Sequence, residues 1–316
     1  MCPEGICVDK VDVIIPVYKP GQKFLDLIEA LEHQSIPVNR IILINTEQKY
    51  FDRLFYGTSF EKKYHNIMVK HISKREFDHG RTRNKGVQYS EADYFIMMTD
   101  DAVPVDEYMV EELLEGLHTT PKAAVAYGRQ LADEDSDETE KFSRNFNYPE
   151  EPAVKTQADL DRLGVKTFFC SNVCAAYNRQ IFDTLGGFIR HTIFNEDMIY
   201  AAGAVKAGYA VVYRAQAKVR HSHYFTCRQQ LHRNFDLGVS HADHPEIFAA
   251  YPSESEGIRL VKQMIRHLWE QRLKYKIPYV ILQSGFKYAG YQLGKHYRFL
   301  PRRAVLALSS NKAYWQ

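Results

Sequence analysis

The sequence predicts an α/β fold in which a mainly parallel sheet carries helices on both faces and a C-terminal helical region follows. Two observations support this prediction. Short β-branched runs, such as VDVIIPVY at 11–18 and RIILIN at 40–45, alternate with stretches of helical periodicity, which is typical of parallel sheets. Beyond Thr226 the apolar residues recur only at helical spacing, so the last part of the chain is expected to be helical.

Strands and helices are expected to alternate along the first 130 residues. The first strand ends in a turn at Lys19-Pro20-Gly21, and an apolar pattern of helical spacing follows and stops before Pro37. The elements expected next are strands at 40–45 and 67–72, a helix at 83–90, a strand at 93–99, a helix at 106–118 and a strand at 123–128.

An acidic segment, residues 131–160, opens the second half of the chain. Six acids fall within 133–140, so this segment is expected to be a solvated excursion outside the core. The elements expected after it are a helix at 180–188, a helix beginning at Glu196, a strand ending in VRHSHYFT, and helices at 226–238, about 255–275 and 277–296. A boundary near residue 240 divides the chain into an α/β domain of residues 9–240 and a basic, mainly helical region of residues 241–316.

The composition is that of a soluble globular protein, with 45% hydrophobic and 25% charged residues. The start, MCPEGICVDK, lacks the pattern of a signal peptide, and no uncharged apolar run is long enough to predict a membrane span. Five cysteines at irregular spacing do not form a disulfide framework, which favours a reducing cytoplasm. Cys170 and Cys174 lie in an apolar stretch and are expected to be buried thiols.

Positive charge is concentrated at the C-terminal end. Residues 257–316 hold 12 lysines and arginines and a single acid, Glu270, whereas residues 1–256 hold 29 basic and 38 acidic residues. Such a basic region is attracted to phosphate, either on an anionic membrane surface or on nucleic acid. The alternatives are a solvated basic face and a capping or homodimerisation bundle.

Polar side chains follow several of the predicted strands. Tyr18, Asn45 and the pair Asp100 and Asp101 each come where a strand ends, and the carboxyl ends of parallel strands share one edge of the sheet. Paired carboxylates are good ligands for Mg²⁺ or Mn²⁺, which prefer hard oxygen donors. A surface turn has the same residue pattern, so the pair alone leaves both interpretations open.

Three more clusters carry groups suited to chemistry. In FDHGRTRNKG (77–86), Arg81 and Arg83 before a helix start suit a phosphate or nucleotide, although a polar loop capped by Thr82 or Asn84 is the alternative. Glu196 and Asp197 begin a helix, where the helix dipole favours acids. His221 and His223 point to one face of a strand, because side chains repeat every two residues.

Taken together and in this order, these features resemble the family 2 glycosyltransferases of GT-A fold, over residues 11 to about 240. The blocks that carry the resemblance are VDVIIPVY, RTRNKGVQYSEADYFIMMTDDAVP and SNVCAAYNRQIFDTLGGF followed by NEDMIYAAGAVKAGY. The narrower pattern F-x-H-G-x-T-R-N, followed later by HSHYFTCRQQLHRNFDLG, looks like the bacterial rhamnosyltransferase branch of the family.

The resemblance implies an inverting transfer of a sugar from a nucleotide-diphospho-sugar to a glycan or lipid-linked glycan at the inner face of the cell membrane. The donor that the resemblance favours is dTDP-rhamnose, and UDP-galactofuranose, UDP-glucose and UDP-N-acetylhexosamine are the alternatives. It makes Asp197 the general base, with Glu196 orienting the acceptor or the loop, and Asp101 a ligand of Mg²⁺ or Mn²⁺, joined by His221 or His223. The donor-binding residues that it implies are Pro16, Val17, Tyr18, Asn45, Arg81, Arg83, Asn84 and Asp100.

Two departures from the family pattern affect the site. Thr99 stands where the Asp-x-Asp motif has its first carboxylate, which leaves Asp101 as the direct metal ligand and Asp100 nearer the ribose or sugar. The second strand ends in INTEQ instead of an acidic pair, so Asn45 or Glu47 must contact the nucleotide. One rival class is a nucleotidyltransferase, which would need a glycine-rich phosphate loop after the first strand, where this chain has PVYKPGQ. The other is a nucleic-acid-binding protein, which would leave the Asp100–Asp101 and Glu196–Asp197 pairs without a role.

Overall fold

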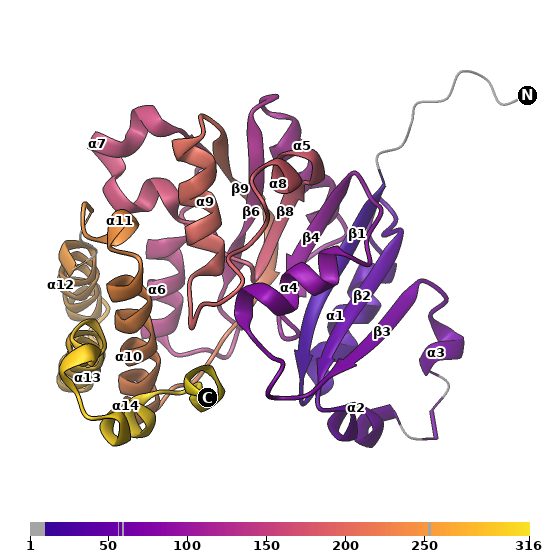
Figure 1. The fold of residues 1–316 in the computed structure, drawn as a ribbon. Helices are drawn as coiled ribbons and strands as arrows, with labels where there is room; N and C mark the ends of the chain where they lie inside the picture. The colour runs from indigo at the N-terminus through magenta and orange to yellow at the C-terminus, as the bar shows by residue number, and fades with distance from the viewer. Residues whose placement is uncertain (1–9, 56, 59, 252–253) are drawn as a thin grey trace, which may run out of the picture.

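The computed structural model describes residues 10–55, 57–58, 60–251 and 254–316, so the N-terminal segment with Cys2 and Cys7 lies outside the described residues. A nine-stranded sheet forms the centre of these residues, in the order β3-β2-β1-β4-β8-β6-β9-β5, with β7 paired to β9 (Figure 1). The strands are β1 (Val11–Tyr18), β2 (Arg40–Thr46), β3 (Ile67–Ile72), β4 (Tyr94–Met98), β5 (Val103–Pro104), β6 (Ala123–Leu131), β7 (Ala153–Lys155), β8 (Cys174–Asn178) and β9 (Ala210–Arg220).

The sheet has a parallel part and a mixed part. Strands β1 to β4 are parallel to one another, and β6 is parallel to β9. Between them β8 runs antiparallel to both of its neighbours, β4 and β6. The carboxyl ends of β1, β2, β4, β6 and β9 therefore share one edge of the sheet, as expected from the sequence.

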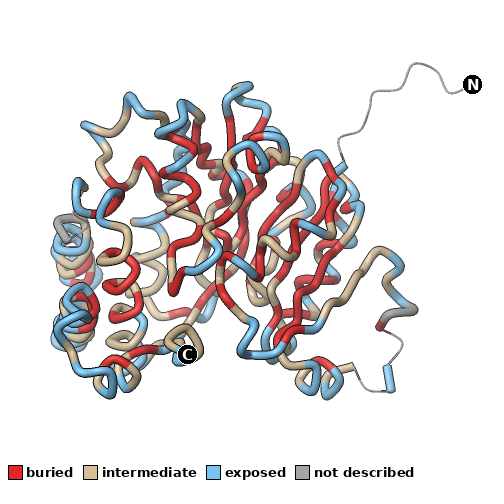
Figure 2. The backbone as a smooth tube through the Cα atoms, viewed as in Figure 1, coloured by how far each residue is buried: buried red, intermediate tan, exposed pale blue. Residues whose placement is uncertain are grey.

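Helices cover both faces of the sheet, because both faces of the central strands are apolar. In β1, Ile14 packs into one hydrophobic cluster while its neighbours Val13 and Ile15 pack into the other. Figure 2 shows the strands as the most deeply buried part of the chain. The helices of this part are α1 (Gln22–Glu32), α2 (Gln48–Phe55), α3 (Phe60–Lys63), α4 (His79–Val87), α5 (Met109–His118), α6 (Glu138–Asn147), α7 (Leu160–Leu163), α8 (Arg179–Thr184) and α9 (Glu196–Lys206).

Two local expectations were wrong. Helix α4 begins at His79 instead of residue 83, because Asp78 caps it by accepting hydrogen bonds from the backbone N–H groups of Gly80 and Arg81. The acidic segment is not a simple loop, since α6 begins within it and Tyr148 and Lys155 are buried. Glu138 and Glu140 are favourably placed at the positive end of the α6 dipole, and other acids of the segment pair with lysine and arginine side chains from distant parts of the chain.

The C-terminal part consists of helices, as expected, and these are α10 (Cys227–Asp243), α11 (Pro245–Phe248), α12 (Glu254–Glu270), α13 (Ile277–Lys295) and α14 (Arg302–Leu308). Helices α10 and α13 approach closely at Gly238, Gly290 and Gly294, where a methyl group would collide with the backbone of the facing helix. Within the described residues, no helix combines the length and the apolar character that crossing a bilayer requires.

The last residues of the chain return to the sheet domain. Val305 and the partly buried Tyr314 and Trp315 pack against Phe235 of α10 and against Ile193, which lies shortly before α9. Figure 1 shows the C-terminus close to α10 and α14. The C-terminal region therefore contacts the segment that leads into the Glu196–Asp197 pair.

Candidate active site

Pairing between β5 and β9 brings Asp101 to the two histidines. Strand β5 begins two residues after Asp101 and pairs antiparallel with the end of β9, with Val103 opposite Arg220. The carboxylate of Asp101 lies 3.3 Å from Nε2 of His221 through one oxygen and 3.3 Å from Nε2 of His223 through the other. The three side chains offer ligand atoms that all lie within 4.8 Å of one another.

Neighbouring groups fix the orientation and charge of this triad. Gln130 of β6 places its Oε1 3.1 Å from Nδ1 of His221, so an Nδ1–H donates to it and Nε2 is left to face Asp101. Burial acts to raise the pKa of Asp101, but the facing imidazoles, His221 first and then His223, lower it well below its usual range. Burial and then His221 lower the pKa of His223 to about 4, with a smaller contribution from Arg233.

The donor-side residues expected from the sequence lie together at the carboxyl edge of β1, β2 and β4. Val17 pairs with Asn45 across β1 and β2, and Asp100 accepts a hydrogen bond of 3.0 Å from the backbone N–H of Tyr18. Burial, together with the charge of Asp101, raises the pKa of Asp100 to about 6. Pro16 precedes this cluster in β1 and is half-buried.

Asn45 and Tyr18 present different chemistry at this edge. Asn45 is fully buried, its Nδ2 lies 2.9 Å from Nδ1 of His71, and its Oδ1 has no hydrogen-bond partner among the described residues. Tyr18 is exposed and meets the ring of Tyr50 edge-on, at 5.5 Å between centroids. The amino group of Lys19 lies within about 5 Å of both tyrosine rings.

The adjacent acids Glu196 and Asp197 have separate partners. Glu196 is buried and forms an ion pair of 3.1 Å with Nη1 of Arg83, and it also accepts a hydrogen bond of 3.0 Å from Nδ2 of Asn172. Asp197 accepts hydrogen bonds from the backbone N–H groups of Asn172, at 2.9 Å, and of Met198, at 2.8 Å. Asn195, in the left-handed conformation at φ +65°, turns the chain into α9 at this point.

These surroundings shift the pKa values of the two acids in opposite directions. Burial and the adjacent charge of Glu196 raise the pKa of Asp197 to about 7. Burial acts to raise the pKa of Glu196 as well, but the charge of Arg83 prevails and lowers it. Near neutral pH, Glu196 is therefore an ionised structural partner of Arg83, whereas Asp197 is able to take up and release a proton.

The α4 residues expected to bind phosphate have protein partners. Arg81 donates to the backbone carbonyl of Glu76, and Arg83 is buried against Glu196. Asn84 bonds through its amide to both the N–H and the C=O of Phe188, at 3.0 and 2.8 Å, and so ties α4 to the loop before α9. The contact of Arg81 and Arg83 with phosphate, and of Asn84 with the donor, stays a prediction.

Three residues around the site were not predicted. Asn172 holds both acids, Gln130 orients His221, and Arg233 lies with its guanidinium over the rings of Phe225 and Phe194. Asn172 stands in the quoted SNVCAAY block, but nothing in its spacing relates it to Glu196. The predicted burial of Cys170 and Cys174 is confirmed, and both are free thiols.

Comparisons with known sequences indicate a sugar transferase. Residues 12–186 match the family described as glycosyl transferase family 2. The chain is 38% identical over 308 residues to the O-antigen chain rhamnosyltransferase RfbN of Salmonella typhimurium, which covers 97% of this chain and 96% of the relative. It is also 38% identical over 306 residues to the O-antigen chain rhamnosyltransferase WbaN of Salmonella anatum, with 96% and 95% covered.

Solved structures share the fold at low sequence identity. A mannosyltransferase from Pyrobaculum calidifontis, PcManGT in complex with GDP-Man and Mn²⁺, superposes with a TM-score of 0.57 at 13% identity and covers 99% of this chain and 86% of its own. Residues 1–349 of S. aureus TarS in complex with UDP-GlcNAc superpose with a TM-score of 0.51 at 13% identity, with 92% and 91% covered.

Proposed function

The chain belongs to glycosyl transferase family 2 and is a glycosyltransferase, and from that premise we propose that it transfers rhamnose from dTDP-rhamnose to a hydroxyl group of a growing O-antigen polysaccharide. The assignment of rhamnose as the sugar and of the O-antigen as the acceptor rests on the similarity to two O-antigen chain rhamnosyltransferases, which extends over nearly the full length of both chains. The site geometry supports the class of reaction.

The reaction proposed is a single displacement with inversion. The acceptor hydroxyl forms a bond to the anomeric carbon, the bond from that carbon to the nucleoside diphosphate breaks, and the hydroxyl proton passes to a carboxylate oxygen of Asp197. A base works best when its pKa lies near the working pH, and the pKa of Asp197, raised to about 7, meets that condition. Glu196 is not suited to this role, because the charge of Arg83 lowers its pKa and so its affinity for a proton, and the ion pair keeps its side chain buried.

Asp101, His221 and His223 fit a divalent cation. Their ligand atoms converge, and Gln130 fixes His221 in the tautomer that leaves Nε2 free, as in many metal sites. Two imidazoles beside one carboxylate suit Mn²⁺ better than Mg²⁺, which prefers oxygen ligands. The cation, when bound, would neutralise charge that develops on the departing diphosphate.

The edge formed by β1 and β2 supports nucleotide binding. The buried Oδ1 of Asn45 lacks a partner among the described residues, and an unsatisfied buried acceptor costs about 1–3 kcal/mol unless a ligand donor fills it. The exposed ring of Tyr18 and the partly buried ring of Tyr50 offer flat apolar surface to a base. Asp100 lies between this edge and Asp101, where it would meet the ribose or the sugar.

An exposed apolar face on α13 supports binding to the inner leaflet of the cell membrane, where a lipid-linked acceptor would be reached. Ile281, Leu282, Tyr288 and Leu293 recur at helical spacing and are all exposed. Arg272 and Lys274 lie before this face, and residues 257–316 hold 12 cations against one acid. An apolar stripe flanked by cations is the pattern of helices that lie in the interface of anionic bilayers.

The test is an assay of the Asp197→Asn variant with dTDP-rhamnose and a lipid-linked glycan. The amide keeps the shape of the carboxylate but cannot accept the proton, so transfer should fall by 10²-fold or more while the affinity for dTDP-rhamnose stays within about threefold. Substantial transfer by Asp197→Asn would refute the role of this residue. Failure of the wild-type chain to use dTDP-rhamnose, with turnover of another nucleotide-sugar, would refute the donor.

A further inference from the structure

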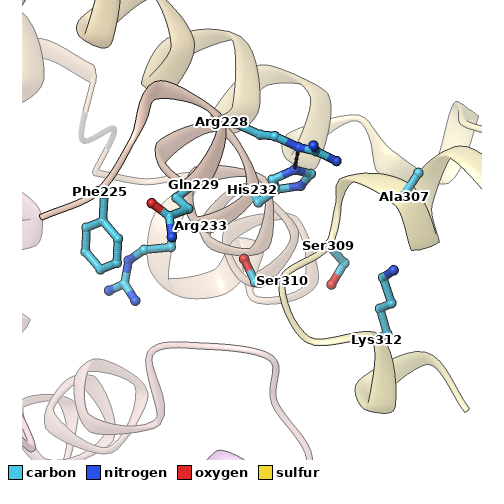
Figure 3. Close-up of a pocket in the computed structure, with 9 residues that line it drawn as sticks. All are labelled: Phe225, Arg228, Gln229, His232, Arg233, Ala307, Ser309, Ser310 and Lys312. Carbon is cyan, nitrogen blue, oxygen red and sulfur yellow. Dashed lines mark hydrogen bonds between the residues drawn. The ribbon is translucent and has the colours of Figure 1, made fainter. Parts of the chain in front are cut away.

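A cationic cavity lies between the first turns of α10 and the C-terminal segment. Its volume is about 380 Å³, within the range of small-ligand pockets. Figure 3 shows Arg228 and Arg233 on the α10 side and Lys312 on the opposite side. The remaining lining residues are Phe225, Gln229, His232, Ala307, Ser309 and Ser310. The lining thus combines three permanent cations with hydroxyl and amide groups and includes no carboxylate.

Among the residues that the structure describes, the three cations have no carboxylate in direct contact, although the charges of Asp236 and Asp101 act on Arg233 from a distance. Within the described part of the chain, none of Arg228, Arg233 and Lys312 forms an ion pair with a carboxylate. Nε of Arg228 donates to Nε2 of His232 at 3.3 Å, which itself carries no negative charge. Three like charges around one cavity repel one another, and an anion placed between them would relieve that repulsion.

The segment of residues 309–312, which forms the wall of the cavity opposite α10, is held by hydrogen bonds to its backbone. Asp236 of α10 is buried and accepts a hydrogen bond of 2.9 Å from the backbone N–H of Ser310. The hydroxyl of Ser309 accepts from the N–H of Asn311 at 3.1 Å. These bonds anchor the backbone of Ser310 and Asn311 to the neighbouring structure, and this anchored segment carries Lys312 on the side of the cavity opposite α10.

The cavity borders the Asp101–His221–His223 triad. The ring of Phe225, which lines the cavity, lies 5.1 Å from the ring of His223. The guanidinium of Arg233 lies 4.8 Å from the same phenylalanine ring. A ligand that fills the cavity would therefore reach to within one side chain of the proposed metal site.

We propose that this cavity binds a phosphate or diphosphate group, with Arg228, Arg233 and Lys312 as its ligands. Guanidinium groups match the oxygens of phosphate in geometry, and three cations suit the charge of a diphosphate. Two substrates of the proposed reaction can supply that group: the nucleotide-sugar through its diphosphate, and the acceptor through the phosphate that joins its glycan to a lipid. This assignment of sources rests on the proposed function, whereas the anion site itself does not.

The first experiment measures anion binding without catalysis. Inorganic pyrophosphate is titrated calorimetrically into the full chain in EDTA, so that a divalent cation at the triad does not contribute. The Arg228→Ala/Lys312→Ala double variant should bind pyrophosphate at least fivefold more weakly than wild type. Lys122→Ala is the matched control, because Lys122 is an exposed cation at the opposite edge of the sheet, before β6. Absence of binding to wild type, or a loss below fivefold in the double variant, overturns the anion site.

The second experiment separates the two sources by steady-state kinetics of the same double variant. A KM for dTDP-rhamnose raised at least fivefold, with either acceptor, assigns the cavity to the donor. A KM raised only for a glycan on a diphosphate lipid, and unchanged for the same glycan on a phosphate-free alkyl chain, assigns it to the acceptor. Both KM values unchanged overturn a role in substrate binding. If wild type does not use dTDP-rhamnose at all, the proposed function fails while the pyrophosphate titration still decides the anion site.

Discussion

Replacing Glu196 by glutamine would separate the functions of the two adjacent acids. Glutamine keeps the size of the side chain and an oxygen that can accept from Asn172, but it removes the charge that faces Arg83. The arginine is then left without a counter-ion in a site where its side chain is 8% exposed. The substitution therefore perturbs both the stability of the fold and the proton affinity of Asp197.

The structure sets the size of both effects. Removing one partner of a buried ion pair costs about 3–5 kcal/mol, a large part of the roughly 5–15 kcal/mol that stabilises a typical domain. The charge of Glu196 raises the pKa of Asp197, while the charge of Arg83 lowers it. In Glu196→Gln the negative charge of Glu196 is lost and the positive charge of Arg83 remains. The pKa of Asp197 should therefore fall by about 1 unit or more.

Two measurements test these values. Urea denaturation should show the loss of stability, and the double variant Arg83→Met/Glu196→Gln should recover part of it, because no buried charge is left unpaired. The pH dependence of kcat should retain its form, with the acidic limb moved to lower pH, since Asp197 must be deprotonated to act as base. An unchanged limb in a folded variant would show that Asp197 is not the group that titrates, and an unchanged stability would refute the buried ion pair.

Three further predictions concern other parts of the molecule. Asp101→Ala should abolish the increase in dTDP-rhamnose affinity on adding Mn²⁺, measured by calorimetry, and full wild-type activity in EDTA would contradict a metal site. Burial lowers the pKa of Lys155 to about 7, so the native state binds fewer protons than the unfolded chain above that pH. The stability of wild type relative to Lys155→Met should therefore rise between about pH 7 and 10, by up to about 1.4 kcal/mol per unit; a flat difference in urea denaturation would refute this. Ile281→Glu/Leu282→Glu should lose sedimentation with anionic vesicles and keep its activity on a water-soluble acceptor, and unchanged sedimentation would refute docking through α13.

The grouping of Asp101, His221 and His223 was only partly predictable from local rules. The acids of TDDA follow a buried strand, as expected. The expectation that His221 and His223 lie on one face of a strand was wrong, because β9 ends at Arg220 and both histidines follow it. The contact between the segments was not predictable. It depends on a two-residue strand, Val103–Pro104, whose pairing with β9 leaves no periodic signal in the sequence.

The arrangement around Glu196 could not be predicted, since it depends on the low dielectric of the interior. Arg83 and Glu196 are far apart in the sequence, and each charge alone suggested contact with substrate. Only burial, which makes an unpaired charge costly, requires them to pair with each other. The prediction that the acidic segment is a solvated loop was wrong for a related reason. Asp137 caps α6 and also pairs with Lys276, a partner that the local sequence does not reveal.

The packing of the C-terminal segment decides how membrane docking should be tested. Val305, Tyr314 and Trp315 cover Phe235 and Ile193, and Tyr314 also stacks on His191 at 4.4 Å between ring centroids. A chain cut at residue 257 would expose this cluster and loosen the segment that leads to Glu196, so its loss of activity would say nothing about membranes. The substitutions on α13 avoid this difficulty, because Ile281 and Leu282 are 54% and 53% exposed and are not part of that cluster. Loss of vesicle binding without loss of transfer to a soluble acceptor would then identify α13 as the surface that carries the catalytic site to its lipid-linked substrate.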